Sequence, residues 1–126
     1  MVNIANMSLS KRVLLVDDDS DLLEALQLMF ELDGFVTRGL ERGNNITSVV
    51  QEFSPDVIVL DVLLSGEDGR NICKKLKGAE QTKGIPVVML SSYPGVEQSV
   101  AASGADCFVA KPFDLDRLLD VVTQLI

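Results

Sequence analysis

The strongest constraint in this sequence is an alternation of short aliphatic runs with longer amphipathic stretches. Five runs rich in Val, Leu and Ile are bounded by polar residues, Gly or Pro, at residues 13–16, 35–37, 57–60, 87–90 and 108–110. They lack the period-two alternation of a half-exposed strand. This pattern favours the strands of a parallel sheet that is covered on both faces.

The stretches between these runs carry apolar residues at helical spacing. In residues 21–32, Leu22, Leu26 and Met29 fall on one side, and Asp21 and Glu24 have capping-box spacing. Four further helices are expected near residues 45–53, 68–77 and 96–102 and from about residue 114 onward. Five strands that alternate with five helices predict an α/β fold, doubly wound, with a parallel five-stranded sheet between two helical layers.

Length and composition limit the protein class. The 126 residues suit one domain, expected over residues 11–126, with a flexible N-terminal arm over residues 1–10. Cys73 and Cys107 form no CxxC or Cys/His cluster, so a zinc site is excluded. No run has the length of a membrane span and no secretory segment is evident, so we expect a cytoplasmic chain without a membrane partner.

The charged residues exclude two functional classes. The chain has 19 Asp and Glu against 11 Lys and Arg, a formal net charge of −8. Such a surface repels phosphate backbones, so no direct binding of nucleic acid is expected. The chain also contains no histidine, which excludes histidine-based catalysis by its own residues.

Polar residues follow the aliphatic runs. Right-handed crossovers place the carboxyl ends of all five strands at one edge of the sheet, where ligands bind in such folds. Each residue alone has an ordinary interpretation as a cap or a turn, and a helix cap explains Asp19 best. The residues that follow the first, third, fourth and fifth runs are Asp17, Asp18 and Asp19; Asp61; Ser91 and Ser92; and Lys111 and Pro112.

In combination these residues predict a specific chemistry. Asp17, Asp18 and Asp61 would place three negative charges in a partly desolvated cleft, where they cannot all ionise without a cation. A few carboxylates with water suit Mg²⁺. Lys111 adds a positive charge and Ser91 a hydrogen-bond donor. A carboxylate nucleophile with these partners predicts an aspartyl-phosphate site.

The chain resembles the receiver domain of two-component response regulators, and chemotaxis receivers in particular, over residues 12–126. Four segments carry the resemblance in order: VLLVDDD at 13–19, DVIVLD at 56–61, PVVMLSS at 86–92 and GADCFVAKPF at 104–113. The resemblance implies a flavodoxin-like (βα)5 three-layer sandwich with strand order 2-1-3-4-5.

The resemblance also implies the roles of the site residues. Asp61 would accept a phosphoryl group from a phosphohistidine of a sensor histidine kinase or a histidine phosphotransfer protein. Asp17, Asp18, Asp61 and the backbone carbonyl of Leu63 would hold Mg²⁺ or Mn²⁺. Lys111 would bridge to Asp61 or its phosphate. The domain would catalyse its own phosphotransfer and autodephosphorylation and no other reaction.

A conformational switch is the second implication. Ser91 would bond a phosphoryl oxygen, and Phe108 would turn inward as Ser91 moves; the open alternative for Phe108 is a permanently buried core ring. The signal would reach a downstream target or an output domain through the face formed by the fourth helix, fifth strand and fifth helix. Formation of a homodimer on phosphorylation is left open.

Two departures from the family pattern stand near Asp61. Residues 64–69 read LSGEDG where the family usually has Met-Pro-x-Met-Asp-Gly, so the stiffening proline is missing. Leu63 and Tyr93 occupy the positions two after Asp61 and Ser91, which in the family flank the route of the attacking water. We therefore expect slow hydrolysis of the phosphoryl group, with simple local packing of both side chains as the alternative.

Two other functions compete with this interpretation. A small phosphohydrolase of the haloacid-dehalogenase type would use Asp17 and Asp19 as its Asp-x-Asp pair, although the chain has no room for a cap domain. A receiver-like interaction module that is never phosphorylated is the second rival. The location of any phosphate, Asp61 or Asp17, separates the first rival from the receiver interpretation.

Overall fold

The structure is a computed structural model that describes residues 10–126. The arm expected over residues 1–10 lies outside the described residues except for Ser10. Within the described part, no helix has the length and apolar character needed to cross a membrane.

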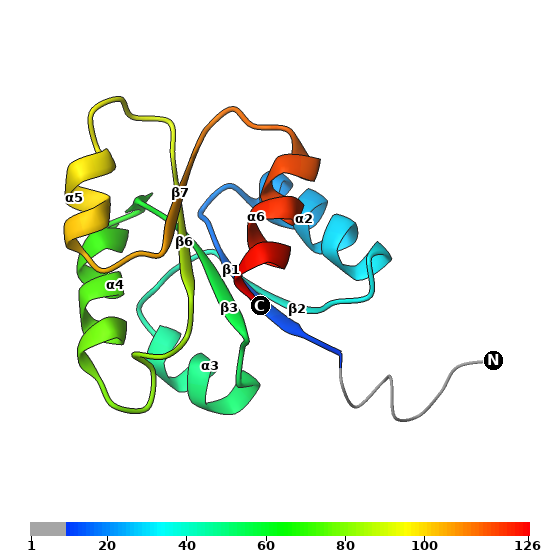
Figure 1. The fold of residues 1–126 in the computed structure, drawn as a ribbon, viewed down its shortest axis with the longest axis horizontal. Helices are drawn as coiled ribbons and strands as arrows, with labels where there is room; N and C mark the ends of the chain where they lie inside the picture. Colours follow the sequence, from blue (N-terminus) through cyan, green and yellow to red (C-terminus); the bar gives the residue numbers. More distant parts are fainter. Residues whose placement is uncertain (1–9) are drawn as a thin grey trace.

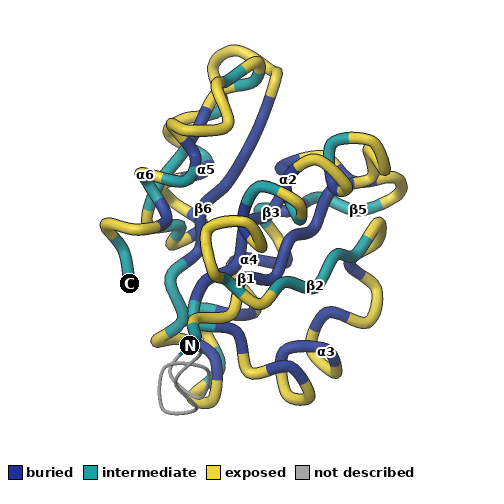
Figure 2. The backbone as a smooth tube through the Cα atoms, turned by 90° about the vertical axis from the view of Figure 1, so that its right-hand side faces the viewer, coloured by how far each residue is buried: buried dark blue, intermediate teal, exposed yellow. Residues whose placement is uncertain are grey.

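Five parallel strands form the central sheet, in the order β2-β1-β3-β6-β7. Counted among these five strands alone the order is 2-1-3-4-5, which confirms the predicted topology. Every residue of β3 and β6 is buried, and Figure 2 shows β6 as a continuous buried segment. The strands are β1 (Arg12–Val16), β2 (Val36–Leu40), β3 (Val57–Asp61), β6 (Val87–Ser91) and β7 (Cys107–Ala110).

Helices cover both faces of this sheet. Helices α2 and α6 lie on one side, and α3, α4 and α5 lie on the other (Figure 1). The predicted three-layer architecture is therefore confirmed. The helices are α2 (Ser20–Leu32), α3 (Ile46–Phe53), α4 (Gly69–Gly78), α5 (Glu97–Ala102) and α6 (Leu115–Leu125).

The strand residues alternate between two hydrophobic cores. Val13 and Leu15 pack in the core beneath α2 and α6, whereas Leu14 and Val16 pack in the core beneath α3, α4 and α5. All four side chains are at most 1% exposed. Because both faces of β1 are covered from Val13 to Val16, this run needs apolar residues at every position, which explains the missing period-two alternation.

Several element boundaries differ from those expected. Helix α2 begins at Ser20 because Asp19 is its N-cap: the Asp19 side chain accepts the backbone N–H groups of Asp21 and Leu22 at 3.1 Å each. The interpretation of Asp19 as a cap is confirmed, and the expected helix start at Asp21 is wrong. Strand β2 extends to Leu40, beyond the apolar run at 35–37, because backbone pairing with β1 continues through polar positions.

Candidate functional site

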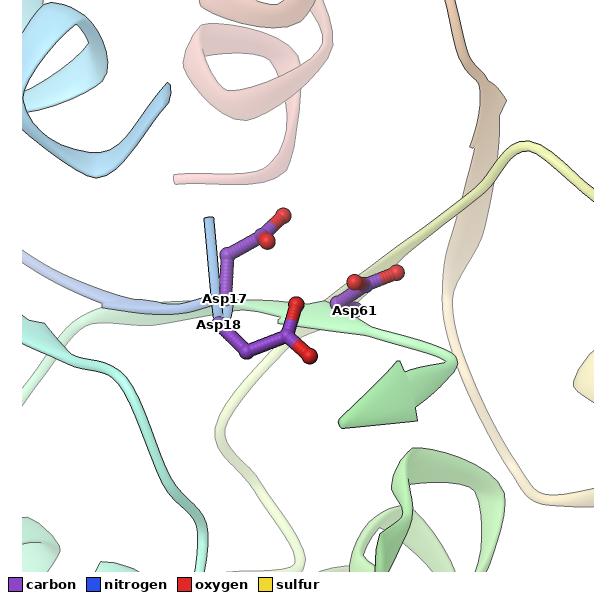
Figure 3. A group of neighbouring side chains, drawn as sticks. All are labelled: Asp17, Asp18 and Asp61. Atoms are coloured by element: carbon purple, nitrogen blue, oxygen red, sulfur yellow. The ribbon is translucent and has the colours of Figure 1, made fainter. Parts of the chain in front are cut away.

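The three predicted carboxylates meet at the carboxyl edge of the sheet. Asp61 is the last residue of β3, and Asp17 and Asp18 directly follow the neighbouring strand β1. One carboxylate oxygen from each residue lies within 4.8 Å of the others. Figure 3 shows the three side chains around a common space. The cluster predicted from strand ends is therefore present.

Two members of the cluster are buried and the third is exposed. The exposed fraction is 1% for Asp17 and 7% for Asp61, whereas Asp18 belongs to the exposed surface. Asp17 is fixed at two points: its Oδ1 accepts the N–H of Asp19 at 2.9 Å, and its own N–H donates to the carbonyl of Leu40 at 3.0 Å. Asp17 thus has a set position, and Asp18 lies at the solvent side of the cluster.

Lys111 contacts both buried carboxylates. Its Nζ lies 2.7 Å from Asp17 Oδ2 and 3.4 Å from Asp61 Oδ2. The lysine follows β7, and its backbone N–H donates to the carbonyl of Ser91 at 2.8 Å; the Lys111–Pro112 peptide bond is cis. The lysine therefore reaches Asp61, as predicted, but in this structure its shorter contact is with Asp17.

Burial and neighbouring charges shift the pKa values of Asp61 and Lys111. Burial and the negative charge of Asp17 raise the pKa of Asp61 from its ordinary value of 3.8 to about 6, although Lys111 acts in the lowering direction. Burial lowers the pKa of Lys111, but its hydrogen bond to Asp17 and the charges of Asp61 and Asp17 raise it overall. Three carboxylates, of which Lys111 contacts two, form a set of hard oxygen donors that fits Mg²⁺ or Mn²⁺.

Ser91 lies at the same edge of the sheet. It ends β6, one residue after Leu90, which pairs with Asp61, and it is 2% exposed. Its Oγ accepts the backbone N–H of Tyr93 at 3.0 Å. Tyr93 is 56% exposed and Leu63 is 38% exposed. The hydroxyl is therefore held in place, while the two side chains expected to affect hydrolysis reach solvent.

Phe108 lies on β7 opposite Met89 of β6. Its ring is partly buried and packs against the core beneath α3, α4 and α5. It thus has core contacts and a solvent-facing part, and both roles considered for it, switch and core ring, stay predictions. The role of the Leu63 carbonyl as a metal ligand also stays a prediction.

Two residues of the site region were missed by the sequence analysis. Ser65 Oγ donates to Asp18 Oδ2 at 3.0 Å. Arg70 binds Asp68 through two nitrogens, at 2.9 and 2.7 Å, and its third nitrogen donates to Ser99 Oγ at 3.0 Å. The sequence did contain one sign of a role for Ser65, because it places a polar residue where the family usually has proline. Nothing in the sequence pattern links Arg70 with a serine 29 positions away.

Comparisons with known sequences agree with this geometry. The response regulator receiver domain model matches residues 13–123. The DNA-binding dual master transcriptional regulator RpaA of Synechocystis sp. is 31% identical over 117 residues, which are 91% of this chain and 48% of that protein. The DNA-binding response regulator MtrA of Mycolicibacterium smegmatis is 35% identical over 114 residues, 89% of this chain and 49% of that protein. The chain thus spans about half the length of these curated relatives.

Solved structures show the same fold. A putative response regulator from Chloroflexus aurantiacus superimposes with a TM-score of 0.86 at 30% identity, covering 92% of this chain and 97% of that one. The chemotaxis response regulator CheY4 of Vibrio cholerae has a TM-score of 0.85 at 24% identity, covers 93% of this chain and 99% of its own, and supports the fold alone. With the family model matching nearly the whole described chain, the protein belongs to the response regulator receiver domain family.

Proposed function

We propose that Asp61 accepts a phosphoryl group from a phosphohistidine of a sensor histidine kinase or a histidine phosphotransfer protein, and that this changes the signalling state of the domain. The observation that carries the proposal is the convergence of Asp17, Asp18 and Asp61 within 4.8 Å, with Lys111 against the two buried members. The donor histidine belongs to the partner, since the chain has none.

The chain's own residues provide the nucleophile and part of the charge compensation. A carboxylate oxygen of Asp61 bonds to phosphorus while the phosphorus–nitrogen bond of the phosphohistidine breaks, and the released imidazole nitrogen takes up a proton from water. With a pKa of about 6, Asp61 is mostly ionised at pH 7 and ready to attack. Lys111 Nζ lies 3.4 Å from Asp61 Oδ2, close enough to form an ion pair with the phosphoryl oxygens once Asp61 is phosphorylated. Ser91 offers its hydroxyl at the same edge.

The cofactor in this proposal is Mg²⁺ or Mn²⁺. Asp17, Asp18 and Asp61 would hold it, with the backbone carbonyl of Leu63 as a further ligand. When bound, the cation supplies positive charge that offsets the charge of the phosphoryl oxygens. The grouping of one oxygen from each of three carboxylates within 4.8 Å supports this assignment. Burial and the charge of Asp17 also raise the pKa of Asp61, so a bound cation would favour its ionised form.

The domain acts in this proposal as a signalling module in the cytoplasm and catalyses only its own phosphotransfer and autodephosphorylation. Its signal passes to a downstream target or an output domain through the face formed by α5, β7 and α6. RpaA and MtrA, which are described as DNA-binding, are about twice as long as this chain. We assign nucleic-acid contact to such an output part and not to this domain, whose net charge is −8.

The structure favours this function over the phosphohydrolase. That enzyme would need Asp19 as the second member of an Asp-x-Asp pair, but the Asp19 carboxylate caps α2 by accepting the N–H groups of Asp21 and Leu22. The carboxylate that lies beside Asp17 in the three-carboxylate cluster is that of Asp61, not that of Asp19. The cap role of Asp19 leaves Asp61 as the partner of Asp17.

Labelling with acetyl phosphate and Mg²⁺ tests the proposed function. Intact-mass spectrometry should show one added phosphoryl group on the wild-type protein and none on Asp61→Asn, because an amide cannot act as the carboxylate nucleophile. Asp19→Asn is the matched control and should label normally, since Asn caps helices as well as Asp does. Equal labelling of wild type and Asp61→Asn would contradict the proposal.

Hydrolysis of the phosphoryl group should be slow and should depend on Leu63 and Tyr93. Neither the Leu63 side chain nor the exposed Tyr93 ring offers a carboxylate or amide to orient an attacking water. Replacing them together by Leu63→Asn and Tyr93→Glu should accelerate the decay of labelled protein by about tenfold or more, because the new groups can hydrogen-bond the water. The decay rate after removal of acetyl phosphate is the measurement, and an unchanged rate would assign both side chains to local packing.

A further inference from the structure

The loop after Asp61 forms a regular hairpin. Strands β4 (Leu63–Leu64) and β5 (Glu67–Asp68) pair antiparallel, which the sequence analysis did not predict. The turn between them is Ser65-Gly66, and Gly66 has φ of 79°, a left-handed conformation that favours glycine. The missing proline is therefore replaced by a structured turn whose first residue carries a hydroxyl.

The base of this hairpin rests on the backbone of Asp61. The N–H of Gly69 donates to the carbonyl of Val62 at 2.6 Å. A Cβ placed on Gly69 would lie only 2.1 Å from the Asp61 carbonyl oxygen, so this close approach requires glycine. The hairpin is thus seated directly against the strand end that presents the phosphoacceptor.

A side-chain network fixes the same base. The Asp68 side chain caps α4 by accepting the N–H of Arg70 at 2.9 Å and forms an ion pair with the Arg70 guanidinium. The guanidinium also donates to Ser99 of α5. These contacts tie β5 to two helices, so the position of the turn is set by the framework of the fold.

The tip of the hairpin contacts Asp18, the exposed member of the three-carboxylate cluster. Ser65 Oγ donates to Asp18 Oδ2 at 3.0 Å. Asp17 is held by burial, Lys111 and a backbone N–H, whereas Asp18 is exposed and has more rotamer freedom to lose. In the orientation held by Ser65, Asp18 still brings an oxygen to within 4.8 Å of Asp17 and Asp61. The hydroxyl uses Oδ2, and Oδ1 has no hydrogen bond to Ser65.

We propose that Ser65 is a positioning residue of the cation site, which holds the Asp18 carboxylate in the orientation that completes the cluster with Asp17 and Asp61. The inference rests on the proposed function, because that function assigns a divalent cation to these three residues. Groups that hydrogen-bond a metal-ligating carboxylate orient it and raise the affinity of the site.

Calorimetric titration with Mg²⁺ alone, together with thermal melts with and without Mg²⁺, tests this role. Ser65→Ala should bind Mg²⁺ about fivefold more weakly, because the released Asp18 carboxylate must then lose rotamer freedom when it binds the cation. Its metal-free melting temperature should stay close to that of the wild type, because the lost hydrogen bond is exposed and water can replace it. Ser65→Thr keeps the hydroxyl and should bind like the wild type. Ser48→Ala, at an exposed position of α3, is the matched control and should change neither quantity.

A second background isolates the contact with Asp18. In Asp18→Asn protein, adding Ser65→Ala should weaken Mg²⁺ binding by less than the fivefold seen alone, because the carboxylate that Ser65 positions is gone. Equal affinity of wild type and Ser65→Ala would overturn the inference, and so would Ser65→Thr binding as weakly as Ser65→Ala. Wild-type protein that binds no Mg²⁺ would instead contradict the proposed function itself.

Discussion

Replacing Asp61 with Asn is expected to raise the free energy of unfolding of the metal-free protein at pH 7 by about 2–3 kcal/mol. Burial and the charge of Asp17 raise the pKa of Asp61 from 3.8 to about 6. The ionised carboxylate is thus more costly in the folded chain than in the unfolded one. The amide removes this cost at the same position. Urea unfolding in the presence of a chelator measures the difference.

The pH dependence follows from the same shift. An acid whose pKa is raised on folding binds its proton more tightly in the folded state, so the stability of the metal-free wild type should fall as pH rises from about 4 to about 6 and then level off. Asp61→Asn should lack this part of the decline. Asp120→Asn, on the exposed side of α6, is the control for removing one negative charge. A lower free energy of unfolding for the Asp61→Asn variant than for the wild type at pH 7 would contradict the electrostatic account.

Replacing Lys111 with Met should have the opposite effect and lower the stability of the metal-free protein by about 3 kcal/mol at pH 7. Lys111 Nζ lies 2.7 Å from Asp17 Oδ2, and the Asp17 side chain is only 2% exposed. Without the lysine, Asp17 and Asp61 face each other with no cation between them. The cost should be smaller at pH 5 than at pH 7, because protonation of Asp61 removes one of the two facing charges, and loss of the lysine raises the pKa of Asp61 further. Denaturant unfolding at pH 7 and pH 5 measures both effects.

Two variants show whether the effect comes from charge. Lys111→Arg keeps a positive charge and should lose much less stability than Lys111→Met. In the double variant with Asp61→Asn, Lys111→Met should cost less than it does alone, because one of the two repelling carboxylates is absent. If Lys111→Met costs the same in both backgrounds, the lysine stabilises the fold through Asp17 or through packing of its aliphatic stem, and not by compensating the charge of Asp61.

The sequence predicts the central sheet well because burial leaves a clear pattern. The runs at 13–16, 57–60 and 87–90 are apolar at every position, and they form strands β1, β3 and β6 with both faces covered. Edge strand β2 is predicted less well: its residues are only partly buried or exposed, so the apolar run covers a small part of it. Where packing does not select apolar residues, the boundary depends on backbone pairing, which a sequence pattern does not report.

The residues of the site also fall into a group that the sequence predicts and a group that it does not. Asp17, Asp18, Asp61 and Lys111 could be predicted because they follow strands, and the topology places all strand ends at one edge. Ser65 belongs to a hairpin that depends on a positive φ at the next glycine and on the close approach of α4 to the backbone of Asp61. Such contacts arise from tertiary packing. Only the structure shows them.

Locating the phosphoryl group on the chain tests the central claim most directly. Protein labelled with acetyl phosphate and Mg²⁺ is reduced with borohydride, which converts a phosphorylated aspartate to homoserine, and the modified residue is identified by peptide mass spectrometry. The receiver mechanism predicts modification at Asp61 alone. Modification at Asp17 with Asp61 untouched would contradict it and would favour the phosphohydrolase arrangement.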